Sequence, residues 1–130
     1  MAANTVPKFI DAPIIGIAEI SVANTKRDGT DTMVVVATGT DAGKVIELIR
    51  VLAIATTTAG MIRLFLHDGS TKYLYKELPV AAVTASPTAP AFEKEFVPTG
   101  GSLTLPTGWT LEAATEKAEA FKVFAFGGNL

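Results

Sequence analysis

The stretch KVIELIRVLAIATTTAGMIRLFLHDGSTKYLYKELPV, from Lys44 to Val80, decides the fold that this sequence predicts. It contains three hydrophobic runs separated by two short connections, TTTAG and HDGST. The first run, Val45 to Ala55, is almost continuously apolar and rich in β-branched residues, which predicts a central strand covered on both faces. The second run, Met61 to His67, alternates apolar and polar side chains, as a strand with one buried face does.

A tight hairpin is expected after this second run. Asp68 and Gly69 form the commonest pair for a two-residue turn, because both central positions of a type I′ turn require positive φ. The turn would pair the second run with a returning strand, Tyr73 to Leu78. Outside this centre, the alternation and the Gly, Pro and Asp punctuation predict further strands at Ile14 to Val22, Thr32 to Thr38, Ala91 to Val97 (an edge strand), Ser102 to Leu105 and from Phe121 onward.

The segment LEAATEKAEAF, Leu111 to Phe121, has high helix propensity. Its apolar residues are mostly alanines, however, and it lies between two runs of period two. We therefore expect a strand, a turn around Thr115 to Glu119, and another strand. With eight to ten short strands in all, the sequence predicts an all-β, antiparallel β-sandwich of jelly-roll or immunoglobulin-like topology.

We expect two parts in the chain, an extended N-terminal arm over residues 1–13 and a β-sandwich domain over residues 14–130. The arm is interrupted by prolines and carries a short apolar patch. Such an arm either lies on a neighbouring protein or packs on its own domain. Its candidate contact residues are Val6, Pro7, Phe9 and Ile10.

Composition limits the classes of function. The 130 residues include no cysteine, which excludes disulfides and thiolate metal sites. The net charge of -2 gives no basic footprint for nucleic acid. No apolar run approaches the ~20 residues that span a membrane, and the N-terminus lacks the pattern of a signal peptide. Only 18% of residues are charged and the mean hydropathy is +0.37, which predicts that other subunits cover part of the surface.

No pattern in the sequence predicts a catalytic, cofactor-binding or metal-binding residue. GTDAGK, Gly39 to Lys44, has three residues between its glycines where a phosphate loop needs four. His67 is the only histidine, and without a nearby acid pair or thiols we interpret it as a polar residue beside a turn. Turn chemistry, in the absence of any known calcium-loop spacing, explains three aspartates: Asp28, Asp31 and Asp41.

Three aromatic residues are candidates for stacking on a sugar ring: Trp109, Tyr73 and Tyr75. Their alternation with polar neighbours is also what core packing requires, so both interpretations stay open. No candidate nucleophile has a base beside it, and we do not expect an enzyme.

Two stretches, TTTAGMIRLFLHDGSTKYLYKELPV (Thr56 to Val80) and LTLPTGWTLEAATEKAEAFKVFAFGG (Leu103 to Gly128), resemble a family of small proteins encoded in tailed-phage and prophage genomes. The distinctive elements are TTTAG, the RLF-type strand followed by DG, and LPTGW. The resemblance implies a non-enzymatic structural protein of the virion.

The resemblance, the low content of charged residues and the apolar arm together lead to a first hypothesis, a capsid decoration, or cement, protein. Such a protein would bind the outer surface of the major capsid protein shell as a homo-oligomer, expected to be a trimer, after synthesis in the host cytoplasm. It would bind neither nucleic acid nor membrane. The alternative is a tail or baseplate component that recognises a host-surface glycan through Trp109 and the two tyrosines.

Overall fold

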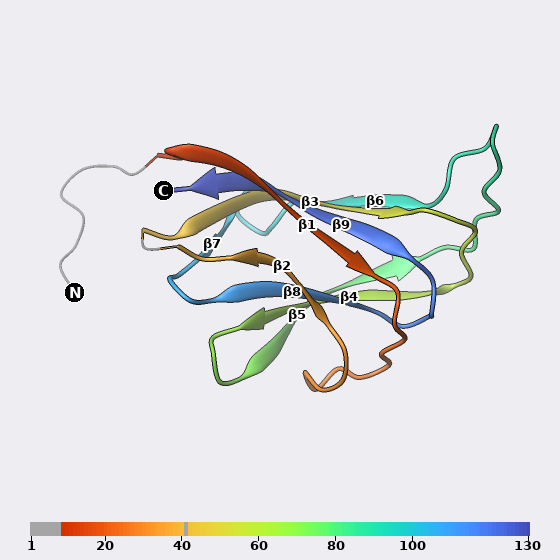
Figure 1. Ribbon diagram of the computed structural model, residues 1–130, viewed down its shortest axis with the longest axis horizontal. Helices are drawn as coiled ribbons and strands as arrows, with labels where there is room; N and C mark the ends of the chain where they lie inside the picture. The colour runs from red at the N-terminus through yellow and green to blue at the C-terminus, as the bar shows by residue number, and fades with distance from the viewer. Residues whose placement is uncertain (1–8, 41) are drawn as a thin grey trace.

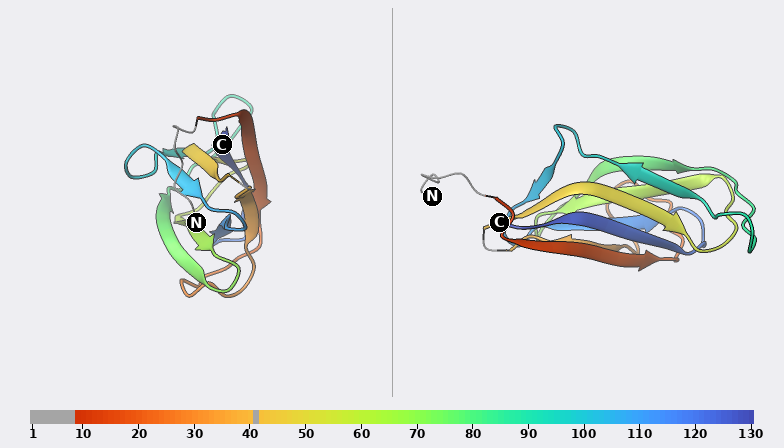
Figure 2. Two further views of the ribbon diagram at one scale, coloured as in Figure 1. Left: turned by 90° about the vertical axis from the view of Figure 1, so that its left-hand side faces the viewer. Right: turned by 90° about the horizontal axis from the view of Figure 1, so that it is seen from above.

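Two antiparallel β-sheets packed face to face make up the part of the chain that the computed structural model describes, residues 9–40 and 42–130 (Figures 1 and 2). The first sheet has the order β1-β9-β3-β6, with β7 also paired to β3, and the second has the order β2-β8-β4-β5. The predicted all-β, antiparallel sandwich is therefore confirmed. The strands are β1 (Ala12–Ile20), β2 (Val34–Thr38), β3 (Lys44–Ala53), β4 (Gly60–His67), β5 (Lys72–Val80), β6 (Glu93–Phe96), β7 (Leu103–Leu105), β8 (Thr110–Thr115) and β9 (Phe121–Asn129).

The strands pair as in a long hairpin that has been rolled up. The tip is the β4–β5 hairpin, and outward from it β3 pairs with β6 and β7, β2 with β8, and β1 with β9. Early strands thus pair with late ones in nested order, which is the arrangement of a jelly roll. Of the two topologies predicted, the jelly roll describes this fold and the immunoglobulin-like one does not.

The strand β3 is central, as predicted, because β9 lies on one side of it and β6 and β7 on the other. The prediction that both of its faces are covered is wrong. Ile49 and Val51 are fully buried, whereas Leu48 is only partly buried and the exposed Glu47 precedes it. Among residues 9–40 and 42–130, no second layer of strands lies over the outer face of this sheet, so the apolar run in the sequence does not correspond to burial on both sides.

The β4–β5 hairpin has a four-residue loop and not the predicted two-residue type I′ turn. His67 pairs with Lys72, and of the loop residues only Gly69 has positive φ, at 101°. The Asp68 carboxylate accepts hydrogen bonds from the backbone N–H groups of Thr71 at 2.8 Å and Ser70 at 2.9 Å. These bonds lower the pKa of Asp68. They also satisfy the backbone N–H groups of the loop and so stabilise its four-residue form.

The remaining strand predictions are close to the structure. The segment Leu111 to Phe121 forms the predicted strand, turn and strand, because β8 ends at Thr115 and β9 begins at Phe121. The strand β1 starts at Ala12, so the last two residues assigned to the arm belong to the sheet. The arm residues Val6 and Pro7 lie outside the described residues.

The core lies between the two sheets and takes one face of each strand. At one side the sheets approach so closely that β1 has no room for a side chain at Gly16. An ideal Cβ on Gly16 would overlap the carbonyl oxygen of Val36 in β2. Glycine at this position therefore lets the edge strands of the two sheets meet.

Replacing Gly16 by alanine is expected to destabilise the fold by about 1–3 kcal/mol, because backbone atoms must move apart to admit the methyl group. Gly60→Ala, also in a strand, is the matched control. Its Cβ would meet mainly the flexible Lys117 side chain at 3.0 Å, so a change within about 0.5 kcal/mol is expected. Urea unfolding measures both free energies, and equal effects of the two substitutions would contradict this account of β1.

Candidate interaction surfaces

The outer face of the second sheet is covered by the connection between β1 and β2, residues 21–33. Ala23 forms a parallel bridge with Thr115 in β8, and a Cβ on Gly29 would lie 2.8 Å from the Cβ of Lys72 in β5. Phe65 in β4 is fully buried although it is not part of the core between the sheets. The chain therefore covers the centre of this face itself, while Val35 of β2 and Leu74 of β5 stay 46% and 38% exposed.

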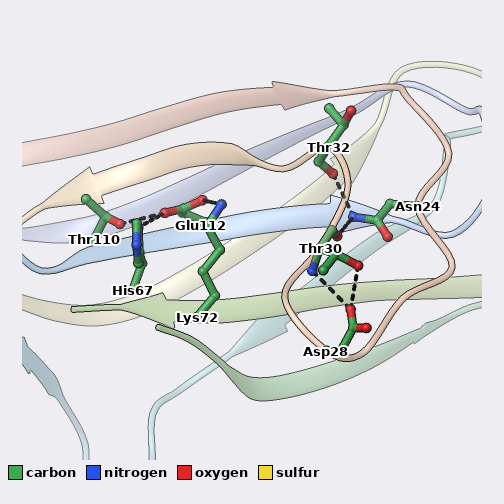
Figure 3. A network of polar contacts seen from close by, with 8 residues as sticks. All are labelled: Asn24, Asp28, Thr30, Thr32, His67, Lys72, Thr110 and Glu112. Carbon is green, nitrogen blue, oxygen red and sulfur yellow. Dashed lines mark hydrogen bonds and ion pairs between the residues drawn. The ribbon is translucent and has the colours of Figure 1, made fainter. Parts of the chain in front are cut away.

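Asn24 fixes the conformation of this connection (Figure 3). Its side chain is almost completely buried and donates to the carbonyl oxygens of Thr30 at 3.0 Å and Thr32 at 2.9 Å. Its backbone N–H donates to the carbonyl oxygen of Thr115 at 2.8 Å, which ties the connection to β8. A buried asparagine with its polar groups satisfied in this way holds a loop in one geometry.

An ion-pair cluster holds the same connection against β4 and β5. Glu77 accepts hydrogen bonds from Arg27 in the connection at 2.8 Å and from Arg63 in β4 at 2.9 Å. The hydrogen bond with Arg27 and then that with Arg63 lower the pKa of Glu77. The Arg63 side chain is only 4% exposed, so its pairing with Glu77 compensates a charge held away from water.

A second polar cluster on this face centres on Glu112 of β8 (Figure 3). One carboxylate oxygen lies 3.0 Å from His67 Nδ1 and accepts a hydrogen bond from Thr110 at 2.8 Å, and the other lies 3.1 Å from Lys72 Nζ. His67 flanks the hairpin as predicted, and a single acid, Glu112, lies beside it. The pairing of β4 with β8 brings Glu112 beside it.

Competing effects act on the pKa of Glu112. Burial would raise this pKa, but the hydrogen bond from Thr110, the hydrogen bond and charge of Lys72 and the contact with His67 together lower it. The carboxylate is thus held ionised with its donors satisfied, which is the pattern of a structural ion pair. Among the described residues, no group of three or more acidic or histidine side chains is arranged to hold a metal ion.

The three aromatic candidates for glycan stacking differ in burial and do not form one exposed platform. Trp109 and Tyr75 are partly buried against the core, and Tyr75 packs edge-on against Phe96 with ring centroids 6.0 Å apart. Tyr73 is 48% exposed. No ring contact joins Trp109 to either tyrosine within the described part of the chain.

The outer face of the first sheet carries a cluster of apolar side chains, which we call the apolar face: Ile15, Ile17, Leu48, Phe124 and Phe126. The two isoleucines of β1 are 55% and 58% exposed. The two phenylalanine rings of β9 stack at 6.1 Å with an angle of 18°. In the right panel of Figure 2, β1, β9 and β3 lie side by side with no other segment crossing over them. This surface leaves no local pattern in the sequence, because its residues come together only through the pairing of distant strands.

At one end of the same sheet lies a shallow hollow of about 460 Å³, which we call the terminal groove. It is lined by Phe9, Ile10, Val45, Glu47, Leu130 and the segment 100–102. Phe9 is 78% exposed, whereas Ile10 packs over Gly128. The structure therefore brings two of the four predicted arm residues to an open apolar site.

Comparison with known proteins adds no identification. The sequence matches no protein-family model and no curated protein. The resemblance to phage proteins thus rests on the motifs quoted above. Within residues 9–40 and 42–130, no helix is long and apolar enough to cross a membrane.

Glu112→Gln is expected to lower the free energy of unfolding by about 1–3 kcal/mol at pH 7, because the Lys72 cation loses its partner. The lowered pKa means that ionised Glu112 stabilises the fold above the ordinary value of 4.5, and that this contribution is lost as pH falls through the lower folded-state value. The difference between wild type and variant should therefore shrink in acid. Urea unfolding between about pH 3 and 7 measures it.

Glu47→Gln, which changes an exposed carboxylate of β3, is the control and should differ little from wild type throughout. A deficit of the Glu112 variant that stays constant down to pH 3 would show that the charge of Glu112 does not stabilise the fold.

Proposed function

We propose that the protein is a non-enzymatic capsid decoration protein, which binds the outer surface of a phage capsid shell and stabilises it. The observation that carries the proposal is the terminal groove, an open and partly apolar hollow at the point where the arm joins the sandwich, with Phe9 exposed at its rim. The resemblance of the two motif-bearing stretches to phage-encoded proteins supplies the identity of the partner, the major capsid protein.

The terminal groove is suited to bind another protein. Phe9 exposes most of a large apolar side chain at the rim, and Val45 and Leu130 provide apolar walls. Burying Phe9 against a partner would contribute about 2 kcal/mol per copy before the costs of association. One such contact is weak, but many copies on a repeating shell would act together.

The sandwich gives this contact a rigid support. Ile10 is held over Gly128 of β9, and the backbone N–H of Asp11 donates to the carbonyl oxygen of Asn129 at 2.7 Å. The residues that follow Phe9 are therefore anchored to the sheet. A partner that grips Phe9 is thereby connected to the whole sandwich.

Purified virions of the phage that encodes this chain should contain hundreds of copies per particle, as a shell protein requires. Quantitative mass spectrometry against the major capsid protein measures the ratio. A handful of copies would place the protein in the tail, and its absence would exclude a virion role.

Phe9→Ser should reduce the copy number on particles and the protection of shells against heat, because it removes the exposed apolar contact. Ile54→Ser is the matched control and should bind normally, because Ile54 is 52% exposed and directly follows the far end of β3. Binding of purified variants to shells that lack the protein, followed by sedimentation, measures both. Equal binding by the two variants would contradict a role for the terminal groove.

A further inference from the structure

We propose that the apolar face is the surface through which two copies of this chain associate, each packing its apolar face on that of the other. The inference concerns self-association of the protein alone and does not depend on the proposed function. It rests on the arrangement of the face, on the cover of the opposite face, on the charges at its border and on its area.

The strand pairing makes the apolar face continuous. Ile17 of β1 pairs with Phe124 of β9, and Ile15 pairs with Phe126. Phe126 pairs in turn with Leu48 of β3, whereas Phe124 pairs with Arg50, where the apolar face ends. Paired residues of neighbouring strands point to the same side of a sheet, so these side chains form adjoining rows and not scattered points.

The centre of the opposite face and the edge strand β6 are protected in ways that this face is not. The outer face of the second sheet lies under residues 21–33, held by Asn24 and Arg27. The edge strand β6 carries Glu93, Lys94 and Glu95 between two prolines, which discourages pairing with another chain. The edge strand β1 has no charged residue from Ala12 to Ala18 and exposes two isoleucines outward. An apolar face left open beside an unprotected edge strand indicates a surface that is covered in the assembled protein.

The charges at the border favour a second copy over a strongly charged partner. At the end of the face toward Ile20, Lys122 pairs with Glu19 at 2.9 Å. In the next row, along β6, Arg50 pairs with Glu93 at 2.6 Å and Glu95 at 3.5 Å. Both groups of charges thus carry both signs. When two such faces pack together, basic side chains of one copy can lie near acidic side chains of the other. The face has no excess charge that would attract an acidic or basic partner.

The whole outer face of the sheet has the area of a weak pair. It consists of β1, β9, β3 and a fourth row shared by the short strands β6 and β7. At about 4.8 Å between strands and roughly 30 Å along them it measures about 600 Å², or about 1,200 Å² for two copies, the low end of standard interfaces. A standard interface buries about 800 Å² on each partner, with an apolar centre and a polar rim. The apolar face with its bordering ion pairs has that anatomy, and sheets pack face to face in just this way within a sandwich.

A contact between two identical faces is complete with two copies, because each copy uses the same surface and has none left for a third. A trimer, by contrast, needs two different surfaces on each protomer. The inference therefore predicts a dimer of the 13.6 kDa chain through the apolar face.

Sedimentation equilibrium of the full chain should give twice the chain mass at micromolar concentration, the weak end of the range for an interface of this size. Ile17→Asp should raise the dissociation constant at least ~100-fold, because it places an unpaired charge inside the contact. Ile54→Asp, the same residue type at 52% exposure against 58%, should leave the dimer intact. Circular dichroism verifies the fold of each variant.

Because the chain has no cysteine, a milder substitution provides a second measurement. Ile17→Cys should react with a maleimide slowly at concentrations where the dimer forms and faster on dilution, whereas Ile54→Cys should react equally fast at both. A monomeric wild-type protein at ~100 µM, a trimer, or a dimer that keeps its affinity with Ile17→Asp would each overturn the inference.

Discussion

The position of β9 between β1 and β3 is the constraint on which the rest of the structure depends. The last strand pairs with the first along its whole length and with β3 on its other side. Its inner side chains Phe121, Val123 and Ala125 fill the core, while Gly127 allows close contact with the backbone of Val45. The first sheet is therefore incomplete until the end of the chain is in place. Such long-range pairing predicts slow folding, because loops must close before contacts form.

The local pattern of the sequence was enough to predict the class of fold and most strands. The segment Leu111 to Phe121 shows this well: its alanine-rich composition favours a helix, yet the alternation on either side correctly indicated two strands. Core packing outweighed intrinsic propensity there. The turn after His67 was predicted less well, because the Asp68 side chain bonds to two backbone N–H groups and so stabilises a longer loop.

The pairing of distant strands could not be predicted from one sequence. The contact between His67 and Glu112, 45 positions apart, depends on the register of β4 against β8, and nothing local to either residue fixes that register. The same holds for the apolar face, whose members come from β1, β3 and β9. Composition indicated that apolar surface would be exposed, but the location of that surface required the strand order.

The terminal groove and the connection between β5 and β6 lie at opposite ends of the sandwich (Figure 1). At the tip of that connection Ser86 and Ala89 form a small closed bend, with Thr88 exposed between them. If the terminal groove contacts a shell, this bend points away from the shell into solvent, because it lies at the opposite end of the sandwich. A foreign epitope inserted at the bend would then be displayed outward on every copy, whereas a tag fused beside Phe9 or Leu130 would obstruct attachment.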